Sequence, residues 1–240
     1  MNHLKKAMVL AAGLGKRMRP ITDTIPKPMV KVSGKTLIDY GLDSLVEAGV
    51  GQAVVNVHYL ADILENHLKN RHDIAISISD ERAELLDSAG GIINALPLLG
   101  EEAFYILNAD TFWVDQQGEP ANLLKMAEAF DETRMDILLM VARLDQATGY
   151  DGKGDFTLTP EARLLRRQDN DPQPVIYAGA AIIHPRIFKD AEAGVSSLNR
   201  YFDHAIANKR LYAMPMHGHW ITVGTPDAIA EAEKALAALN

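Results

Sequence analysis

The chain has 240 residues, of which 48% are hydrophobic and 23% charged, and it contains no cysteine. This length suits one compact α/β domain, and the lack of cysteine excludes a disulfide framework, a thiolate zinc site and a cysteine nucleophile. The 24 Lys and Arg against 32 Asp and Glu give a net charge of −8, which disfavours general nucleic-acid binding because that function requires a wide basic surface.

The first apolar run of the sequence extends from Ala7 to Ala12 and predicts a strand that is buried on both faces. A secretory signal or a membrane span needs a longer apolar run, so we expect neither of them. We therefore expect a cytoplasmic protein without a membrane partner.

Short apolar runs alternate with helical patterns through residues 1–140. Leu37, Ile38, Leu42 and Leu45 are spaced for one helical face, which predicts a helix over 36–49. The other elements expected in this part are strands over 53–57, 74–78, 104–107 and 137–141, and helices over 60–68, 89–96 and 121–130. This alternation favours an α/β fold with a mostly parallel sheet that is covered on both faces.

The last hundred residues are richer in strands. The pattern predicts strands over 155–158, 175–183, 211–214 and 219–223, helices over 196–207 and 226–239, and a surface loop over 166–174. We expect these later strands to extend the sheet and to build a lid-like substrate region.

A glycine-rich, basic loop follows the first predicted strand. It reads GLGKRMRP over 13–20 and continues to PKP over 26–28. Open α/β sheets bind ligands at the carboxyl ends of their strands, which is where this loop begins. Glycines let backbone N–H groups close around phosphate oxygens, and Arg17 and Lys27 add positive charge. The loop therefore predicts a site for a small anionic ligand.

Two familiar phosphate-binding motifs do not fit this loop. A dinucleotide-binding fingerprint would have a third glycine where Met18 stands, and a Walker A loop would separate its glycines by four residues rather than one. A basic surface turn with solvated side chains is the alternative to an anion site.

The order of these residues resembles the signature of the sugar-1-phosphate nucleotidyltransferases, in which Gly-x-Gly-x-Arg-x-x-Pro is followed by Pro-Lys-Pro. Further stretches, LPLLG at 96–100, GKGDF at 152–156, HP at 184–185 and GHW at 218–220, are similar in particular to the N-acetylmuramate-1-phosphate uridylyltransferases of bacterial cell-wall recycling. The resemblance implies a Rossmann-like three-layer fold in one domain over 1–240. Residues 1–143 would form a nucleotide-binding core, and 144–240 the sugar-phosphate-binding and closing elements.

The resemblance also implies a magnesium-dependent reaction. An oxygen of a sugar 1-phosphate attacks the α-phosphorus of a nucleoside triphosphate, with UTP favoured, and pyrophosphate leaves. Such chemistry depends on charge neutralisation and alignment. Arg17 is implied to hold the β- and γ-phosphates, Lys27 to contact the phosphates near the reacting centre, and Asp110 to bind Mg²⁺. A monomer or a small homo-oligomer is expected.

The other implied contacts divide between the two substrates. Nucleotide contacts are expected from Ala11, Ala12, Gly13, Gly15, Gly90 and Gly91. Sugar-phosphate contacts are expected from Asn108, Asp155 and Gly179. A helix N-terminus explains the stretch around Gly90 almost as well, and a hairpin turn explains Asp155 equally well.

A second metal carboxylate is missing from the motif near the C-terminus. The family usually has Trp-x-Asp-x-Gly-Thr there, whereas this chain has Thr222 in place of the aspartate. A hydroxyl brings no charge, so we expect that Asp110 and phosphates hold the ion, that another carboxylate substitutes, or that activity is reduced. His217 and His219 are expected at the surface or against substrate.

Two alternatives to the uridylyltransferase remain open. A mannose-1-phosphate guanylyltransferase keeps the chemistry and changes both substrates. A nucleotide- or sugar-phosphate-binding protein with little turnover would be consistent with Thr222.

Overall fold

The computed structural model describes residues 4–239, which are built around one nine-stranded sheet. Its strands are β1 (Lys6–Leu10), β4 (Gln52–Val57), β5 (Ala75–Asp80), β6 (Phe104–Asn108), β8 (Ile137–Arg143), β10 (Phe156–Leu158), β11 (Leu164–Arg166), β12 (Val175–Ile183) and β13 (Leu211–Pro215). The strands β5, β4, β1 and β6 lie side by side and parallel. Next to β6, the long strand β12 runs antiparallel and pairs in turn with β8, which pairs with β13. The predicted mostly parallel sheet is confirmed.

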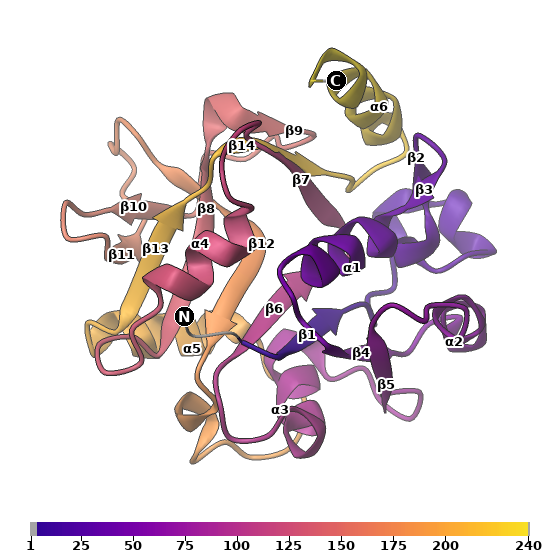
Figure 1. The fold of residues 1–240 in the computed structure, drawn as a ribbon, viewed down its shortest axis with the longest axis horizontal. Coiled ribbons are helices and arrows are strands. Elements are labelled where there is room, and N and C mark those ends of the chain that lie inside the picture. The colour runs from indigo at the N-terminus through magenta and orange to yellow at the C-terminus, as the bar shows by residue number, and fades with distance from the viewer. Residues whose placement is uncertain (1–3, 240) are drawn as a thin grey trace.

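Helices cover both faces of this sheet (Figure 1). They are α1 (Leu37–Glu47), α2 (Ala61–Leu68), α3 (Asp87–Leu99), α4 (Asn122–Ala129) and α5 (Leu198–Ala207). The last helix, α6 (Asp227–Leu239), packs on a separate core. Because successive strand residues point to opposite faces, Ala7 and Val9 join the core beneath α1, α2 and α4, whereas Met8 joins the core beneath α3 and α5. The three-layer prediction is therefore confirmed.

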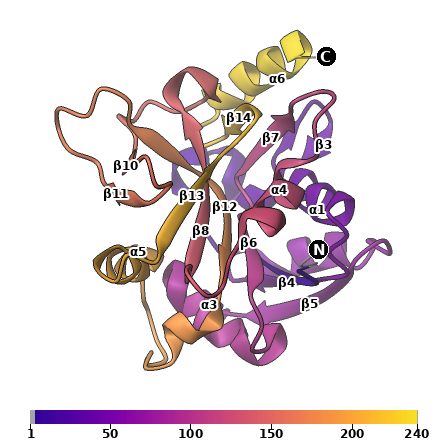
Figure 2. The same ribbon diagram turned by 60° about the vertical axis from the view of Figure 1, so that its left-hand side comes forward.

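A second, smaller sheet departs from the prediction. The strand β14 (Gly218–Thr222) does not extend the central sheet but pairs with β7 (Thr111–Asp115) and β9 (Ala147–Thr148). The sequence pattern did not indicate β7, which begins three residues after β6 ends. A separate core under α6 joins this sheet to the basic loop through Met18, Phe112 and Ile221. The C-terminal elements thus lie beside the N-terminal loop, on the same side in both ribbon views (Figures 1 and 2).

Several short elements complete the chain. The basic loop contains three 3₁₀ turns, Lys16–Met18, Ile21–Asp23 and Lys27–Met29, and is followed by the ribbon β2 (Lys31–Val32) and β3 (Lys35–Thr36).

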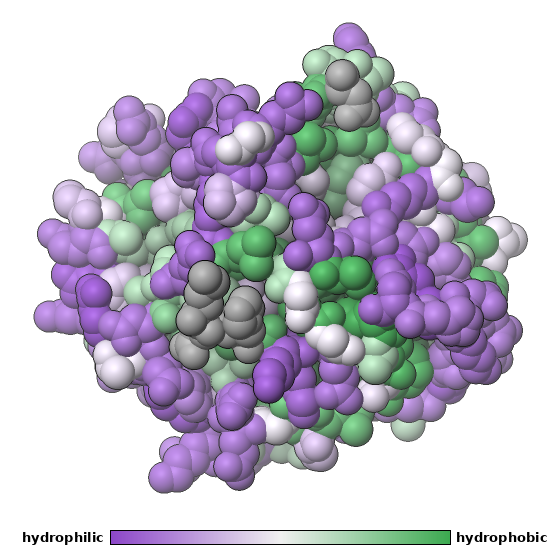
Figure 3. All heavy atoms as spheres, viewed as in Figure 1, coloured by the Kyte–Doolittle hydropathy of each residue, from purple (hydrophilic) through white to green (hydrophobic). Residues whose placement is uncertain are grey.

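Hydrophilic residues cover most of the face in Figure 3, and hydrophobic surface gathers mainly in its middle and beside α6. No helix among residues 4–239 combines the length and apolar character that crossing a membrane requires.

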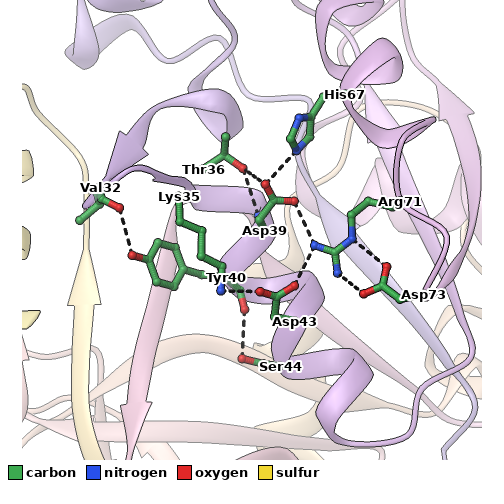
Figure 4. Close-up of polar contacts among 10 residues, drawn as sticks. All are labelled: Val32, Lys35, Thr36, Asp39, Tyr40, Asp43, Ser44, His67, Arg71 and Asp73. Carbon is green, nitrogen blue, oxygen red and sulfur yellow. Dashed lines mark hydrogen bonds and ion pairs between the residues drawn. The ribbon is translucent and has the colours of Figure 1, made fainter. Parts of the chain in front are cut away.

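A polar network ties α1 to the segment between α2 and β5 (Figure 4). The Asp39 carboxylate accepts from the Thr36 hydroxyl at 2.5 Å, lies 2.9 Å from His67 Nε2, and accepts from Arg71 Nη1 at 3.1 Å. Arg71 also pairs with Asp73 at 2.8 Å. Burial raises the pKa of Asp39, but its bonds with Thr36 and His67 and the charges of His67 and Arg71 outweigh burial and leave that pKa below its ordinary value.

We expect Asp39→Asn to destabilise the fold by about 2 kcal/mol at neutral pH, because the Arg71 guanidinium and the His67 ring lose a negatively charged partner. A carboxyl whose pKa is lower in the folded state stabilises the fold above its unfolded pKa of about 4, and that stability is lost as the pH falls through the folded pKa. The wild type should therefore lose more stability than the variant between pH 5 and the folded pKa. Urea unfolding across this range measures the difference.

Asp145→Asn, in an exposed pair with Arg143, is the control and should change the free energy of unfolding by less than about 1 kcal/mol. Equal effects of the two variants would contradict the prediction.

Candidate active site

Two adjoining pockets open at the carboxyl ends of the parallel strands. The first has a volume of about 320 Å³ and receives residues from the ends of β1, β4, β5 and β6 and from the start of α3. It is lined by Leu10, Ala11, Ala12, Gly13, Lys27, Pro28, Asn56, Glu81, Leu85, Asp87, Ser88, Asn108, Ala109 and Asp110. The second, of about 270 Å³, shares Leu10, Ser88 and Asn108 with the first. Two ligands bound in these pockets would therefore meet near Asn108.

The basic loop curls back on itself at Gly15. This residue has φ +61°, and an added Cβ would lie 3.0 Å from Thr22 Cγ2 and 3.1 Å from Lys27 Cβ. The Thr22 hydroxyl donates to the Gly15 carbonyl at 2.8 Å and locks the turn. Glycine is thus needed here both for the backbone angle and for the close approach that brings Lys27 beside the loop. An added Cβ on Gly13, by contrast, would project into open space.

A chain of buried polar contacts holds the start of this loop. The Ala11 N–H donates to Asn56 Oδ1 at 2.7 Å, and Asn56 Nδ2 donates to Glu81 Oε1 at 2.7 Å. The other Glu81 oxygen accepts from the Leu86 N–H at 3.1 Å. The amide of Ala11 is therefore engaged by Asn56. Ala11 lines the first pocket, and its expected nucleotide contact remains a prediction. Within residues 4–239, the amides of residues 12–15 have no hydrogen-bond acceptor.

Sequence reasoning did not select Asn56 and Glu81. The available signals were a polar residue inside the buried run 52–57 and an acid directly after the strand 75–80. Both become informative only once β4 and β5 are known to be neighbours of β1 in the sheet.

Lys27 and Asp110, which lie far apart in the sequence, meet in the first pocket. Lys27 Nζ lies 2.6 Å from Asp110 Oδ2, and only 12% of the lysine side chain is exposed, compared with 38% of the aspartate. Asp110 follows β6 at the point where the chain turns into β7, and its carbonyl accepts from the Val223 N–H after β14. The segment that follows β14 therefore helps to position Asp110 through this hydrogen bond.

Arg17 is exposed beside the C-terminal segment. Its guanidinium nitrogens lie 3.4 and 3.5 Å from the Cβ position of Gly224, so the glycine leaves room for the arginine. Within residues 4–239 the Arg17 side chain has no hydrogen bond or ion pair, and its positive charge is available to a ligand.

The second pocket contains two of the three residues that were expected to hold the sugar phosphate. Asn108 and Asp155 line it, together with Tyr177 and residues of α5. Gly179 is buried at an irregularity of β12 with φ +76°, where an added Cβ would lie 2.3 Å from Thr111 Oγ1 and 3.3 Å from Asn108 Cβ. Gly179 therefore packs closely against Asn108. Its expected contact with the sugar phosphate remains a prediction.

Tyr177 presents a buried hydroxyl without a partner among the described residues. Burial raises the pKa of Tyr177, and the charge of Asp110 raises it further. At neutral pH the hydroxyl is therefore protonated and can donate a hydrogen bond to a ligand in this pocket.

Gly90 and Gly91 have a packing role. An added Cβ on Gly90 would lie 2.3 Å from the Gly194 carbonyl oxygen, and one on Gly91 would lie 2.5 Å from Glu81 Oε1. Both glycines are buried within α3, and Asp87 and Ser88, at the start of that helix, line the first pocket instead. The expected nucleotide contact of the two glycines remains a prediction.

The C-terminal motif lies against the same site. Thr222 is opposite Thr111 in the β7–β14 ladder, so these two side chains are on one face of the small sheet. The expected histidines have protein partners: His217 Nδ1 lies 2.7 Å from Glu119, and His219 Nε2 lies 2.8 Å from the Thr148 hydroxyl. Burial lowers the pKa of His219.

Among residues 4–239, no group of three or more His, Asp or Glu side chains is placed to hold an ion. Mg²⁺ is usually bound by one or two carboxylates together with substrate phosphates and water. The single carboxylate of Asp110, in a pocket with Lys27, fits an ion that arrives with a phosphate ligand, and it does not fit a complete cage of protein ligands.

Comparisons with known proteins agree with this geometry. Residues 6–152 match the model of the family described as Nucleotidyl transferase. The chain is 41% identical over 237 residues to the N-acetylmuramate alpha-1-phosphate uridylyltransferase of Caulobacter vibrioides, covering 97% of each chain. It is 35% identical to the protein of the same name from Neisseria meningitidis serogroup B, covering 95% of this chain and 96% of the other. The crystal structure of a UDP-glucose pyrophosphorylase complexed with UDP-glucose superposes with a TM-score of 0.78 at 20% identity, covering 99% of this chain and 100% of that one, which supports the fold.

Proposed function

The chain belongs to the nucleotidyl transferase family as a sugar-1-phosphate nucleotidyltransferase, and on this premise we propose that it joins UTP to N-acetylmuramate 1-phosphate. The products are UDP-N-acetylmuramate and pyrophosphate, and the proposed role is in cell-wall recycling. The contact of Lys27 with Asp110 beside two adjoining pockets is the observation that carries the proposal.

The two pockets suggest a division of labour. All residues lining the first pocket lie within 10–110, and those lining the second include residues between 155 and 202. We assign the first pocket to the nucleotide and the second to the sugar 1-phosphate. This assignment agrees with the expected division into a core over 1–143 and closing elements over 144–240.

In the proposed reaction a phosphate oxygen of the sugar 1-phosphate attacks the α-phosphorus of UTP. A new P–O bond forms, the bond from the α-phosphorus to the β-phosphate oxygen breaks, and its electron pair leaves with pyrophosphate. The free amides of residues 12–15 can donate to phosphate oxygens, and Arg17 can neutralise charge on the leaving group. Lys27 holds the Asp110 carboxylate and has further N–H groups for the phosphates.

Asp110 would hold Mg²⁺ together with the phosphates. The ion, when bound, supplies positive charge that aligns the phosphates and offsets the negative charge that accumulates on their oxygens. Thr222 adds no charge of its own, so the proposed site depends on Asp110 and on the nucleotide.

A substrate panel tests the proposed function. Pyrophosphate release should be measured for UTP, GTP, CTP and ATP, each with N-acetylmuramate, N-acetylglucosamine, glucose and mannose 1-phosphates. The proposal predicts the highest kcat/KM for UTP with N-acetylmuramate 1-phosphate. A maximum for GTP with mannose 1-phosphate would favour a guanylyltransferase. Tight nucleotide binding with no release for any pair would favour a binding protein.

Thr222→Asp tests the metal ligation. The added carboxylate should lower the Mg²⁺ concentration for half-maximal rate by about tenfold, because each added anionic ligand strengthens divalent-cation binding. A magnesium titration of the initial rate measures this. Thr225→Asp places the same charge three residues further along the chain, outside the ladder, and should leave the titration unchanged. An unchanged titration for Thr222→Asp would show that position 222 does not reach the ion.

A further inference from the structure

Arg166, in the β10–β11 hairpin, lines the second pocket and contacts three other residues. Arg166 Nε donates to Asp203 Oδ1 at 2.7 Å, and Nη2 donates to the carbonyl and side-chain oxygens of Asn199 at 3.1 and 3.0 Å. The guanidinium also lies over the ring of Phe156, 5.0 Å from its centroid. In both ribbon views the hairpin lies beside α5, which supplies Asn199 and Asp203 (Figures 1 and 2). The guanidinium is therefore fixed before any ligand arrives.

These contacts leave two donors without acceptors among residues 4–239. The Nη1 group of Arg166 makes no hydrogen bond in the described part of the chain. Asn199 Oδ1 is used by Arg166, which orients the side-chain amide and leaves Asn199 Nδ2 to donate. Arg166 and Asn199 both line the second pocket, and Arg166 is its one basic residue among those described.

A carboxylate matches this pair of donors. A fixed guanidinium edge and a neighbouring amide N–H₂ can each donate to a carboxylate oxygen, and charge-assisted bonds of this kind are strong. Asp155, on the same pocket, is held by the Tyr177 N–H at 2.9 Å and offers oxygens that suit sugar hydroxyls rather than a second acid. N-acetylmuramate differs from N-acetylglucosamine by a lactyl ether that carries a carboxylate.

We propose that Arg166 and Asn199 bind the carboxylate of an acidic sugar 1-phosphate and thereby select it over its neutral counterpart. The inference rests on the proposed function, because it assigns the second pocket to the sugar substrate. A site that bonds a polar group discriminates against an analogue that lacks the group, because the analogue forgoes the charge-assisted bonds that the fixed donors offer.

The test compares two sugars in wild type and in Arg166→Gln. With UTP, the variant should lose about 10- to 100-fold in kcat/KM for N-acetylmuramate 1-phosphate, the range typical of a lost bond to a charged group. Its kcat/KM for N-acetylglucosamine 1-phosphate should change by less than threefold. Arg163→Gln is the matched control, because Arg163 directly precedes the strand β11 that carries Arg166 and lies outside this pocket. Within residues 4–239 its side chain pairs with Glu161 alone, at 3.9 Å. It should leave both values unchanged.

Asn199→Asp provides a second, independent variant. The aspartate keeps an acceptor for Arg166 but replaces the donor by a second acceptor, so the loss should again be confined to the acidic sugar. Equal losses for both sugars would overturn the inference, because Arg166 would then bind the phosphate or support the fold. An unchanged preference in both variants would overturn it as well.

A binding measurement separates this inference from the proposed function. If no sugar is turned over by the wild type, the proposed function fails. Calorimetry with the two sugar 1-phosphates then still decides the inference, which predicts tighter binding of the acidic sugar by wild type and loss of that preference in Arg166→Gln. Turnover of both sugars with equal kcat/KM by the wild type would leave uridylyl transfer to a sugar 1-phosphate intact, but it would overturn the inference and with it the preference for N-acetylmuramate 1-phosphate.

Discussion

Replacing Asp110 by asparagine is expected to lower kcat by about 10²- to 10³-fold, corresponding to about 3–4 kcal/mol of transition-state stabilisation. Asparagine preserves the shape of the side chain and one oxygen, but it removes the charge that would hold Mg²⁺ and that now pairs with Lys27 at 2.6 Å. Lys27 is only 12% exposed, so it would lose its partner in a place where water compensates poorly. The magnesium requirement should rise together with the fall in kcat.

Initial rates at saturating UTP, sugar 1-phosphate and Mg²⁺ give the comparison. Asp145→Asn removes an exposed carboxylate outside both pockets and should retain wild-type kcat. A near-native melting temperature for Asp110→Asn would show that the fall in kcat comes from the reaction step and not from unfolding. A kcat within threefold of wild type would remove Asp110 from the proposed mechanism.

Arg17→Met should produce a loss of similar size, about 10²-fold or more in kcat. Arg17 is exposed and has no partner within residues 4–239, so its removal costs the fold little. The expected effect arises from charge on the departing pyrophosphate that is no longer neutralised. Because that charge develops in the transition state, kcat and kcat/KM should fall together, and the KM for UTP should change less.

Arg19→Met is the control on the same loop. Arg19 lies two residues further on, has a side chain that is 60% exposed and pairs with Asp23 at 3.2 Å. It carries the same charge as Arg17 but occupies an unspecified position of the motif Gly-x-Gly-x-Arg-x-x-Pro. Equal losses in the two variants would mean that the loop contributes only general positive charge. A change in the KM for UTP alone would mean that Arg17 binds the nucleotide without assisting the reaction.

Much of the fold could be predicted because buried strands and amphipathic helices have distinct patterns. The run around Met8 is apolar on both faces since both faces of β1 are covered by helices. The position of β14 could not be predicted, because an apolar strand pattern does not specify its neighbour. The strand β14 pairs with β7 and β9, and β7 lies in a stretch for which the sequence pattern predicted no element.

The charged residues of the site were easier to predict than their supports. Lys27 and Asp110 were singled out by the motif, and the structure brings them within 2.6 Å. Glu81 was not, because its role depends on contacts with Asn56 and with the start of α3 that arise only in the folded chain. The signal at Gly91 has two explanations, since close packing against Glu81 requires glycine as much as close approach of a ligand does.

The fate of the α-phosphate tests the central claim most directly. UTP labelled at its α-phosphorus should be incubated with N-acetylmuramate 1-phosphate, Mg²⁺ and the enzyme, and the products separated. The proposed function predicts that the label enters UDP-N-acetylmuramate and that one unlabelled pyrophosphate is released for each molecule formed. Label recovered only in UTP, or in UMP without a sugar nucleotide, would contradict it.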